Sequence, residues 1–186
     1  MPTLSQNLVK TQGVFRSLEW NIYKTEHDLA ASLDRELHRV PSPVLGLAIS
    51  LSSEGTLEAL ALATPRRVFV LYFCGHAVKR SSREMSERAG TDAFAAFLSG
   101  QKKPVLGFGM ARLAMHVRHG VSAHVRGIDL SSMSPKNSPG EFVKSLLDQT
   151  ADQFAIDTLW DAFPAELQND PRRLEFLCLR AWLSAR

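Results

Sequence analysis

Cysteine is scarce in this chain of 186 residues, which has only Cys74 and Cys178, each in or beside an apolar run. Two isolated thiols supply neither a disulfide framework nor a cysteine-rich metal site, and they are typical of a reduced intracellular protein. Long apolar runs are also missing, since none approaches the roughly 18 residues that span a bilayer. We therefore expect an intracellular protein, cytoplasmic or nuclear, without a membrane partner.

The N-terminus has no apolar segment of the kind found in secretory signals. We interpret residues 1–13 as a flexible leader and residues 14–186 as one domain, because 45% of the chain is hydrophobic and no change of composition divides it. The chain has 22 basic and 19 acidic residues, a net charge of +3. This charge is compatible with nucleic-acid binding but does not require it.

Several catalytic motifs are absent. The chain has no Gly-x-Ser-x-Gly elbow, and the pair Gly107 and Gly109 lacks the third glycine of a dinucleotide-binding loop. His116, His119 and His124 have a spacing that superficially suits a metal ion, but no cysteine or acidic residue beside them supplies a further ligand. We expect surface or helix-cap histidines here, and neither a metal site nor a cofactor.

Short apolar runs separated by polar breaks predict the strands of a sheet. Residues 43–51 predict a buried central strand, and residues 57–63 and 68–73 predict the next two, joined in an antiparallel meander. Further strands are expected at 14–23, on the sheet edge, and at 105–109 and 125–130.

Helical patterns alternate with these strands. Thr25 and Asp28 form a helix-start signal ahead of leucines that recur every four residues, and Gly120 is expected to end the helix that begins at Met110. Helices are predicted at 26–39, 91–98, 110–119, 139–147 and 171–183, with a loop or a solvated helical turn at 75–90. This order predicts an α/β or α+β fold, with a mixed sheet of about five to six strands flanked by helices.

Three blocks of sequence point to a known family. They are Gly46-Leu-Ala-Ile-Ser50 on the central strand, the segment from Lys103 to Leu113, and Trp160-Asp-Ala-Phe-Pro-Ala-Glu-Leu-Gln168 followed by Phe176-Leu-Cys-Leu-Arg-Ala-Trp182. With the order of elements, these blocks resemble the 3′-5′ exonuclease domain of the ribonuclease D and Werner-syndrome exonuclease type. That family is a branch of the ribonuclease H-like fold, which the resemblance implies for this chain from Val14 onward.

The resemblance also locates the positions where the family places its catalytic groups. Family members hold two divalent metal ions with four acidic residues and orient the attacking water with a tyrosine. Here the matching positions carry no such group; they are Ala48, Ser50, Leu113, Phe176 and Arg180. Two dications about 4 Å apart need several carboxylates to offset their repulsion, and an arginine adds positive charge. The resemblance thus implies a pseudonuclease, a domain that is not an enzyme and has no catalytic residues.

A domain of this kind is expected to act in RNA metabolism as a binding scaffold or adaptor. The implied partners are a protein and, as a further ligand, single-stranded RNA, and a homodimer is compatible with the family. The basic residues that would contact RNA are Lys79, Arg80, Arg83, Lys102, Lys103 and Arg180. The plainer alternatives are a solvated loop and strand entry for the first five, and for Arg180 a carboxylate partner or a solvated helix face.

Other functions stay open. One is an active nuclease with an unconventional metal site built from His116, His119 and Asp129, and another is a nucleic-acid-binding module of a larger helicase or polymerase. The aromatic residues near the C-terminus are expected in the core rather than in a base-stacking surface; they are Trp160, Phe163, Phe176 and Trp182.

Overall fold

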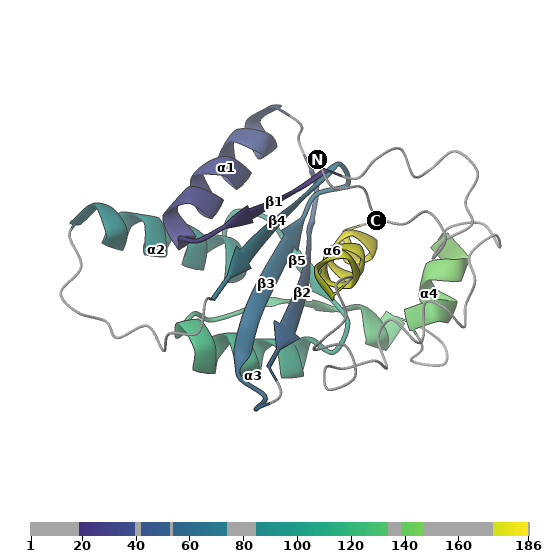
Figure 1. Ribbon diagram of the computed structural model, residues 1–186. Coiled ribbons are helices and arrows are strands. Elements are labelled where there is room, and N and C mark those ends of the chain that lie inside the picture. The colour runs from purple at the N-terminus through teal and green to yellow at the C-terminus, as the bar shows by residue number, and fades with distance from the viewer. Residues whose placement is uncertain are drawn as a thin grey trace.

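The computed structural model describes residues 19–39, 42–52, 54–73, 85–133, 139–146 and 173–185, without the side chains of residues 85–91, 144–146 and 175. The described strands form one six-stranded sheet in the order β1-β4-β3-β2-β5-β6, with helices on both of its faces (Figure 1). The predicted class, a mixed α/β sheet flanked by helices, is confirmed. The predicted leader lies outside the described residues.

The strands are β1 (Glu19–Tyr23), β2 (Leu45–Leu51), β3 (Leu57–Ala63), β4 (Arg67–Tyr72), β5 (Val105–Gly107) and β6 (Gly127–Asp129). β2, β3 and β4 are antiparallel neighbours, as the short breaks between them predict. β1 lies parallel to β4 at one edge, whereas β5 and β6 extend the sheet from β2 in parallel to the other edge. The meander is thus the centre of the sheet, as predicted.

The helices are α1 (Glu26–Arg39), α2 (Met85–Leu98), α3 (Met110–Val121), α4 (Pro139–Leu146) and α6 (Arg173–Ser184), with a 3-10 turn, η1, at Leu130–Met133. α1 begins at the predicted cap, where the Asp28 N–H donates to Thr25 Oγ1 at 3.1 Å and the Thr25 hydroxyl donates to Asp28 Oδ2 at 2.7 Å. α2 begins six residues before the predicted position. None of the described helices is long and apolar enough to cross a membrane.

The prediction that Gly120 ends α3 is wrong. The helix continues through Val121, and Ser122 ends it in the left-handed conformation, with φ 56° and its N–H bonded to the Arg118 carbonyl. A Cβ at Gly120 would lie 2.7 Å from Leu57 Cβ. The glycine is therefore needed for the close approach of α3 to β3 rather than for the end of the helix.

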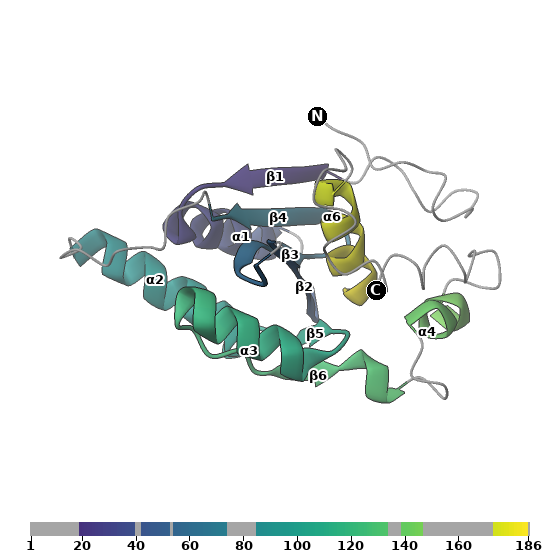
Figure 2. The same ribbon diagram turned by 60° about the horizontal axis from the view of Figure 1, so that its bottom comes forward.

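The two faces of the sheet are covered by different helices (Figure 2), and they present different side chains. What we call the α1 face is covered by α1, α2 and α3 and is built from large apolar side chains, among them Leu47, Ile49, Leu60, Leu62 and Phe69. What we call the α6 face is covered by α6 and presents the small residues Ala48, Ala59, Ala61 and Ala63. Strand alternation along β2 and β3 separates the two sets.

Candidate functional site

Helix α6 lies directly on β2, at the position where the sequence resemblance places the catalytic centre. A side chain at Gly46 would overlap with the main-chain carbonyl of Ala181, so that only glycine allows this contact. Ala48, on the same side of β2, is buried under α6. The small residues of the α6 face therefore let the helix backbone approach the strand closely.

Two arginines of α6 donate hydrogen bonds to β2. Arg180 Nη2 donates to the Ile49 carbonyl at 2.9 Å, while Arg173 donates through Nε to Ser50 Oγ at 3.0 Å and through Nη2 to the Leu51 carbonyl at 2.6 Å. Arg173 also forms an ion pair with Glu58, which accepts a hydrogen bond from the Tyr72 hydroxyl. The two guanidinium groups thus occupy the space between α6 and the end of β2.

Burial determines the electrostatics of this arginine pair. Arg180 is buried, and burial together with the charge of Arg173 lowers the pKa of Arg180 to about 10. Burial also lowers the pKa of Arg173. Arg180 is therefore not on a solvated helix face, and one of its contacts is the main-chain carbonyl of Ile49.

The structure brings together most of the aligned catalytic positions, but not all of them. Ala48, Ser50 and Arg180 lie at the α6 face, and Phe176 packs half-buried against the same core. Leu113 is buried in the core of the α1 face instead, against Gly107. The position that the resemblance assigns to the metal-binding aspartate of the second block is thus on the other side of the sheet.

The residues at the α6 face do not fit a pair of divalent cations. Two arginines bond β2 there, and the Glu58 carboxylate beside them is already paired with Arg173. Within the described ranges, no three His, Cys, Asp or Glu side chains lie close enough together to hold a metal ion. No step of a two-metal reaction follows from this arrangement.

The residues of the alternative nuclease site are separated along α3. Asp129 binds the start of the helix, where its carboxylate accepts hydrogen bonds from the N–H groups of Gly109 at 3.0 Å and Met110 at 2.9 Å. Burial raises the pKa of Asp129, but hydrogen bonds from Ser131 and from those two N–H groups lower it on balance. His116 and His119 lie in later turns of the helix, away from this carboxylate.

The histidines have neighbours that do not suit a metal ion. Burial and the nearby charges of Arg112 and His119 lower the pKa of His116. The exposed ring of His124 lies within hydrogen-bond distance of Arg118 Nη1. A cationic neighbour beside each ring disfavours the approach of a second cation.

Of the basic residues predicted to contact RNA, the three that the structure describes do not lie together. Lys79, Arg80 and Arg83 lie outside the described residues, and Arg180 is buried under α6. Lys102 is exposed, with its Nζ 3.6 Å from Asp34 Oδ1 and 5.9 Å from the centre of the Phe97 ring. Lys103 is half-buried beside it.

The C-terminal aromatic residues that the structure describes belong to the core, as predicted. Trp182 is buried and donates its indole N–H to the Pro65 carbonyl at 2.9 Å, which fastens α6 to the turn between β3 and β4. Phe176 is half-buried against the same core. Trp160 and Phe163 lie outside the described residues.

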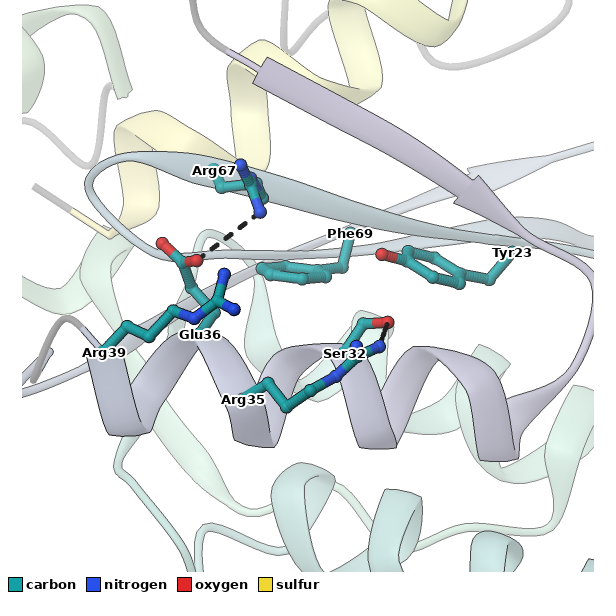
Figure 3. A pocket seen from close by; sticks show the side chains of 7 residues that line it. All are labelled: Tyr23, Ser32, Arg35, Glu36, Arg39, Arg67 and Phe69. Atoms are coloured by element: carbon teal, nitrogen blue, oxygen red, sulfur yellow. Dashed lines mark hydrogen bonds and ion pairs between the residues drawn. The ribbon is translucent and has the colours of Figure 1, made fainter.

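A second candidate site, on the α1 face, was missed from sequence. It is a pocket of about 180 Å³ between α1 and the strands β1 and β4, and we call it the arginine pocket; its lining residues are Tyr23, Ser32, Arg35, Glu36, Arg39, Arg67 and Phe69 (Figure 3). Arg35 and Arg39 are one helical turn apart, a spacing visible in the sequence. That α1 places them opposite Arg67 depends on tertiary packing, which the sequence pattern does not reveal.

The chain is similar to solved structures of the EXD2 exonuclease domain. One of them is 20% identical, covers 82% of this chain and 74% of its own, and has a TM-score of 0.47. A second, soaked in Mg, is 16% identical over 68% of each chain with a TM-score of 0.48, and a third, soaked in Mn, is 19% identical over 89% and 85% with a TM-score of 0.45. No family model and no curated protein matches the chain.

These findings bear differently on two of the sequence predictions. The predicted likeness to an exonuclease domain is confirmed, and the mixed α/β sheet is consistent with the predicted ribonuclease H-like fold. The prediction that the domain is not an enzyme is not upheld: the solved structures to which the chain is similar are exonuclease domains, some of them soaked with Mg or Mn.

Proposed function

We propose that this exonuclease-like domain acts in RNA metabolism by binding, as an adaptor that holds single-stranded RNA on its surface and presents it to a protein partner. The observation that carries the proposal is the pair Arg173 and Arg180. At the position that the resemblance assigns to the catalytic centre, their guanidinium groups are bonded to β2 beneath α6. RNA bound by the domain would therefore lie on other surfaces.

Charge supports RNA as the ligand. The chain has three more basic than acidic residues, and the arginine pocket brings three guanidinium groups to one surface. Guanidinium groups bind phosphate oxygens through paired hydrogen bonds, which makes arginine the side chain best suited to a phosphate backbone. A protein partner would contact the domain elsewhere, and exposed apolar side chains such as Ile128 and Met133 offer such contacts.

The test is fluorescence anisotropy of a labelled single-stranded RNA titrated with the protein over a series of salt concentrations, with Mg²⁺ or Mn²⁺ present. We expect micromolar binding that weakens steeply with salt, because a phosphate-dominated interaction releases counterions. The absence of binding at low salt would overturn the proposal. The length of the RNA after the titration shows whether the domain also cleaves it, and the proposal for binding holds with or without cleavage.

A further inference from the structure

We propose that the arginine pocket on the α1 face binds one backbone phosphate of single-stranded RNA. This inference rests on the proposed function and deepens it by naming the contact site. The pocket lies across the sheet from α6, so a phosphate bound in it would be separated from the arginine pair at β2 by the full thickness of the sheet.

Arg35 and Arg39 supply donors that a phosphate could use. The Arg35 guanidinium is held by two hydrogen bonds within α1, from Nε to the Ala31 carbonyl at 3.2 Å and from Nη2 to Ser32 Oγ at 3.1 Å. A guanidinium has five N–H donors, so most of those of Arg35 remain for a ligand. Arg39 makes no hydrogen bond or ion pair with the described residues, and it lines the same pocket one turn further along the helix (Figure 3).

Arg67 has a different role, because it is already paired. Its guanidinium bonds the Glu19 carboxylate, and its Nη1 lies 3.6 Å from Glu36 Oε2. The hydrogen bond with Glu19 raises the pKa of Arg67. Arg67 shares its single charge between Glu19 and Glu36, so it offsets part of the repulsion that the nearly buried Glu36 carboxylate would exert on an anion.

The charge that remains favours a single anionic group. The two carboxylates offset two of the three guanidinium groups around the pocket, which leaves one net positive charge. That charge is carried by Arg35 and Arg39, on the exposed side of α1. The rings of Tyr23 and Phe69, stacked with centres 6.1 Å apart, lie behind these polar groups and fix the floor of the pocket.

Size restricts the ligand further. A volume of about 180 Å³ equals that of about six liquid water molecules. It is smaller than the roughly 300 Å³ at which pockets for drug-sized ligands begin. A phosphate group with its neighbouring ester oxygens fits this space, and the sugar and base attached to it would lie at the open side of the pocket. The bases would therefore stay outside the pocket, and binding would depend little on RNA sequence.

The experiment compares two double variants that remove the same charge. Arg35→Gln with Arg39→Gln empties the pocket of its unpaired donors, while Arg66→Gln with Arg126→Gln removes two exposed arginines that do not line it. The probe is a labelled single-stranded RNA without terminal phosphates, titrated in the anisotropy assay over a series of salt concentrations. The same RNA with a 5′-phosphate tests whether the pocket prefers a terminal monoester. Circular dichroism confirms that both variants are folded.

We expect the pocket variant to bind RNA about tenfold more weakly or worse, because charge-assisted hydrogen bonds are lost. If both arginines hold one phosphate, the slope of log affinity against log salt should become shallower by about 0.7. The control variant should stay within about twofold of the wild type. Arg39→Lys keeps the charge but not the planar fork, and should lose affinity to an intermediate extent.

Three outcomes would overturn this inference. Equal weakening in both double variants would mean that general charge, not the pocket, binds RNA, and unchanged binding in the pocket variant would place the contact elsewhere; either result leaves the proposed function standing. Binding confined to the 5′-phosphorylated RNA would assign the pocket to a terminal monoester instead of the backbone. If the wild type binds no RNA at low salt, the proposed function itself is wrong, and the inference about the pocket falls with it.

Discussion

The two faces of the sheet are packed against their helices with side chains of very different size. On the α1 face, large side chains such as Leu60 and Phe69 fill the space beneath three helices. On the α6 face, glycine and alanine on β2 and β3 leave so little space that the backbone of α6 rests on the strand. The first face is stabilised mainly by the area it buries, and the second by how closely two backbones approach.

This difference extends to where charge is located. The α6 face buries Arg180 and bonds it to a main-chain carbonyl, whereas the α1 face keeps Arg35 and Arg39 at its exposed rim. An arginine whose donors are bonded inside the fold contributes to structure, and one at a rim is available to a ligand. The comparison therefore predicts that substitutions on the α6 face affect stability, and that substitutions at the rim of the α1 face affect binding.

The largest effect should come from Gly46→Ala. The new methyl group would overlap with the Ala181 carbonyl, which belongs to a helix backbone and cannot rotate away. We expect a loss of more than about 3 kcal/mol in the free energy of unfolding, or failure to fold. Urea unfolding followed by circular dichroism measures it. Gly55→Ala is the control, because Gly55 has φ +75° with open space around it and should lose about 1–2 kcal/mol. Equal losses in the two variants would contradict the close contact of α6 with β2.

A neighbouring pair on β3 contrasts the two faces directly. Leu60 points into the core of the α1 face and Ala61 into that of the α6 face, and both are fully buried. Leu60→Ala should cost about 3 kcal/mol through lost burial and the cavity left behind. Ala61→Gly should cost about 1 kcal/mol. Urea unfolding of both variants measures the two losses in free energy of unfolding. If Ala61→Gly lost more than Leu60→Ala, the side chains of the α6 face would contribute more to stability than their size indicates.

Arg180→Met tests whether the buried charge on the α6 face stabilises the fold. Because a packed apolar side chain avoids the cost of desolvating a charge, we expect the variant to gain about 1 kcal/mol at pH 7. The folded-state pKa of Arg180 is lowered from its ordinary value to about 10, so the unfolded chain binds more protons above pH 10. The wild type should therefore regain stability relative to the variant as the pH rises above about 10.

The measurement is urea unfolding of wild type and Arg180→Met at pH 7, 9 and 10.5, with the exposed Arg66→Met as a control that should show no such trend. The lysines and tyrosines are the same in all three proteins, so their effect on the free energy of unfolding cancels when each variant is compared with the wild type at the same pH. If the difference in free energy of unfolding between wild type and Arg180→Met stayed constant with pH, the Arg180 guanidinium would not be desolvated in the folded protein.

Much of the fold could be predicted from sequence because it depends on local patterns. Residues close together in the sequence determine the apolar runs of β2, β3 and β4 and the cap of α1 at Thr25. Gly120 shows the limit of this reasoning. Its neighbours suggest the end of a helix, but its real constraint is Leu57, which is distant in sequence.

The candidate sites could be predicted only in part for the same reason. The resemblance assigns Ala48, Ser50 and Arg180 to one site, and in the structure these three residues lie at the α6 face. It also placed Leu113 there, but α3 packs against the opposite face. The arginine pocket needs α1 beside β4, and no local pattern in either segment indicates that neighbour.

The smallest effect that we predict concerns α3, which covers the α1 face. Asp129→Asn should cost about 1 kcal/mol at pH 7, because the amide accepts the N–H groups of Gly109 and Met110 less well than the carboxylate does. Because the folded-state pKa of Asp129 is lowered, its carboxylate contributes fully to the free energy of unfolding above the unfolded-state pKa of about 3.9. This contribution is lost as the pH falls through the folded-state pKa. Urea unfolding at pH 7 and at decreasing acid pH should show the wild type losing its advantage over the variant, while the exposed Asp92→Asn follows the wild type throughout. If the advantage survived at the lowest pH, the contact of Asp129 with the start of α3 would not depend on the charge of the carboxylate.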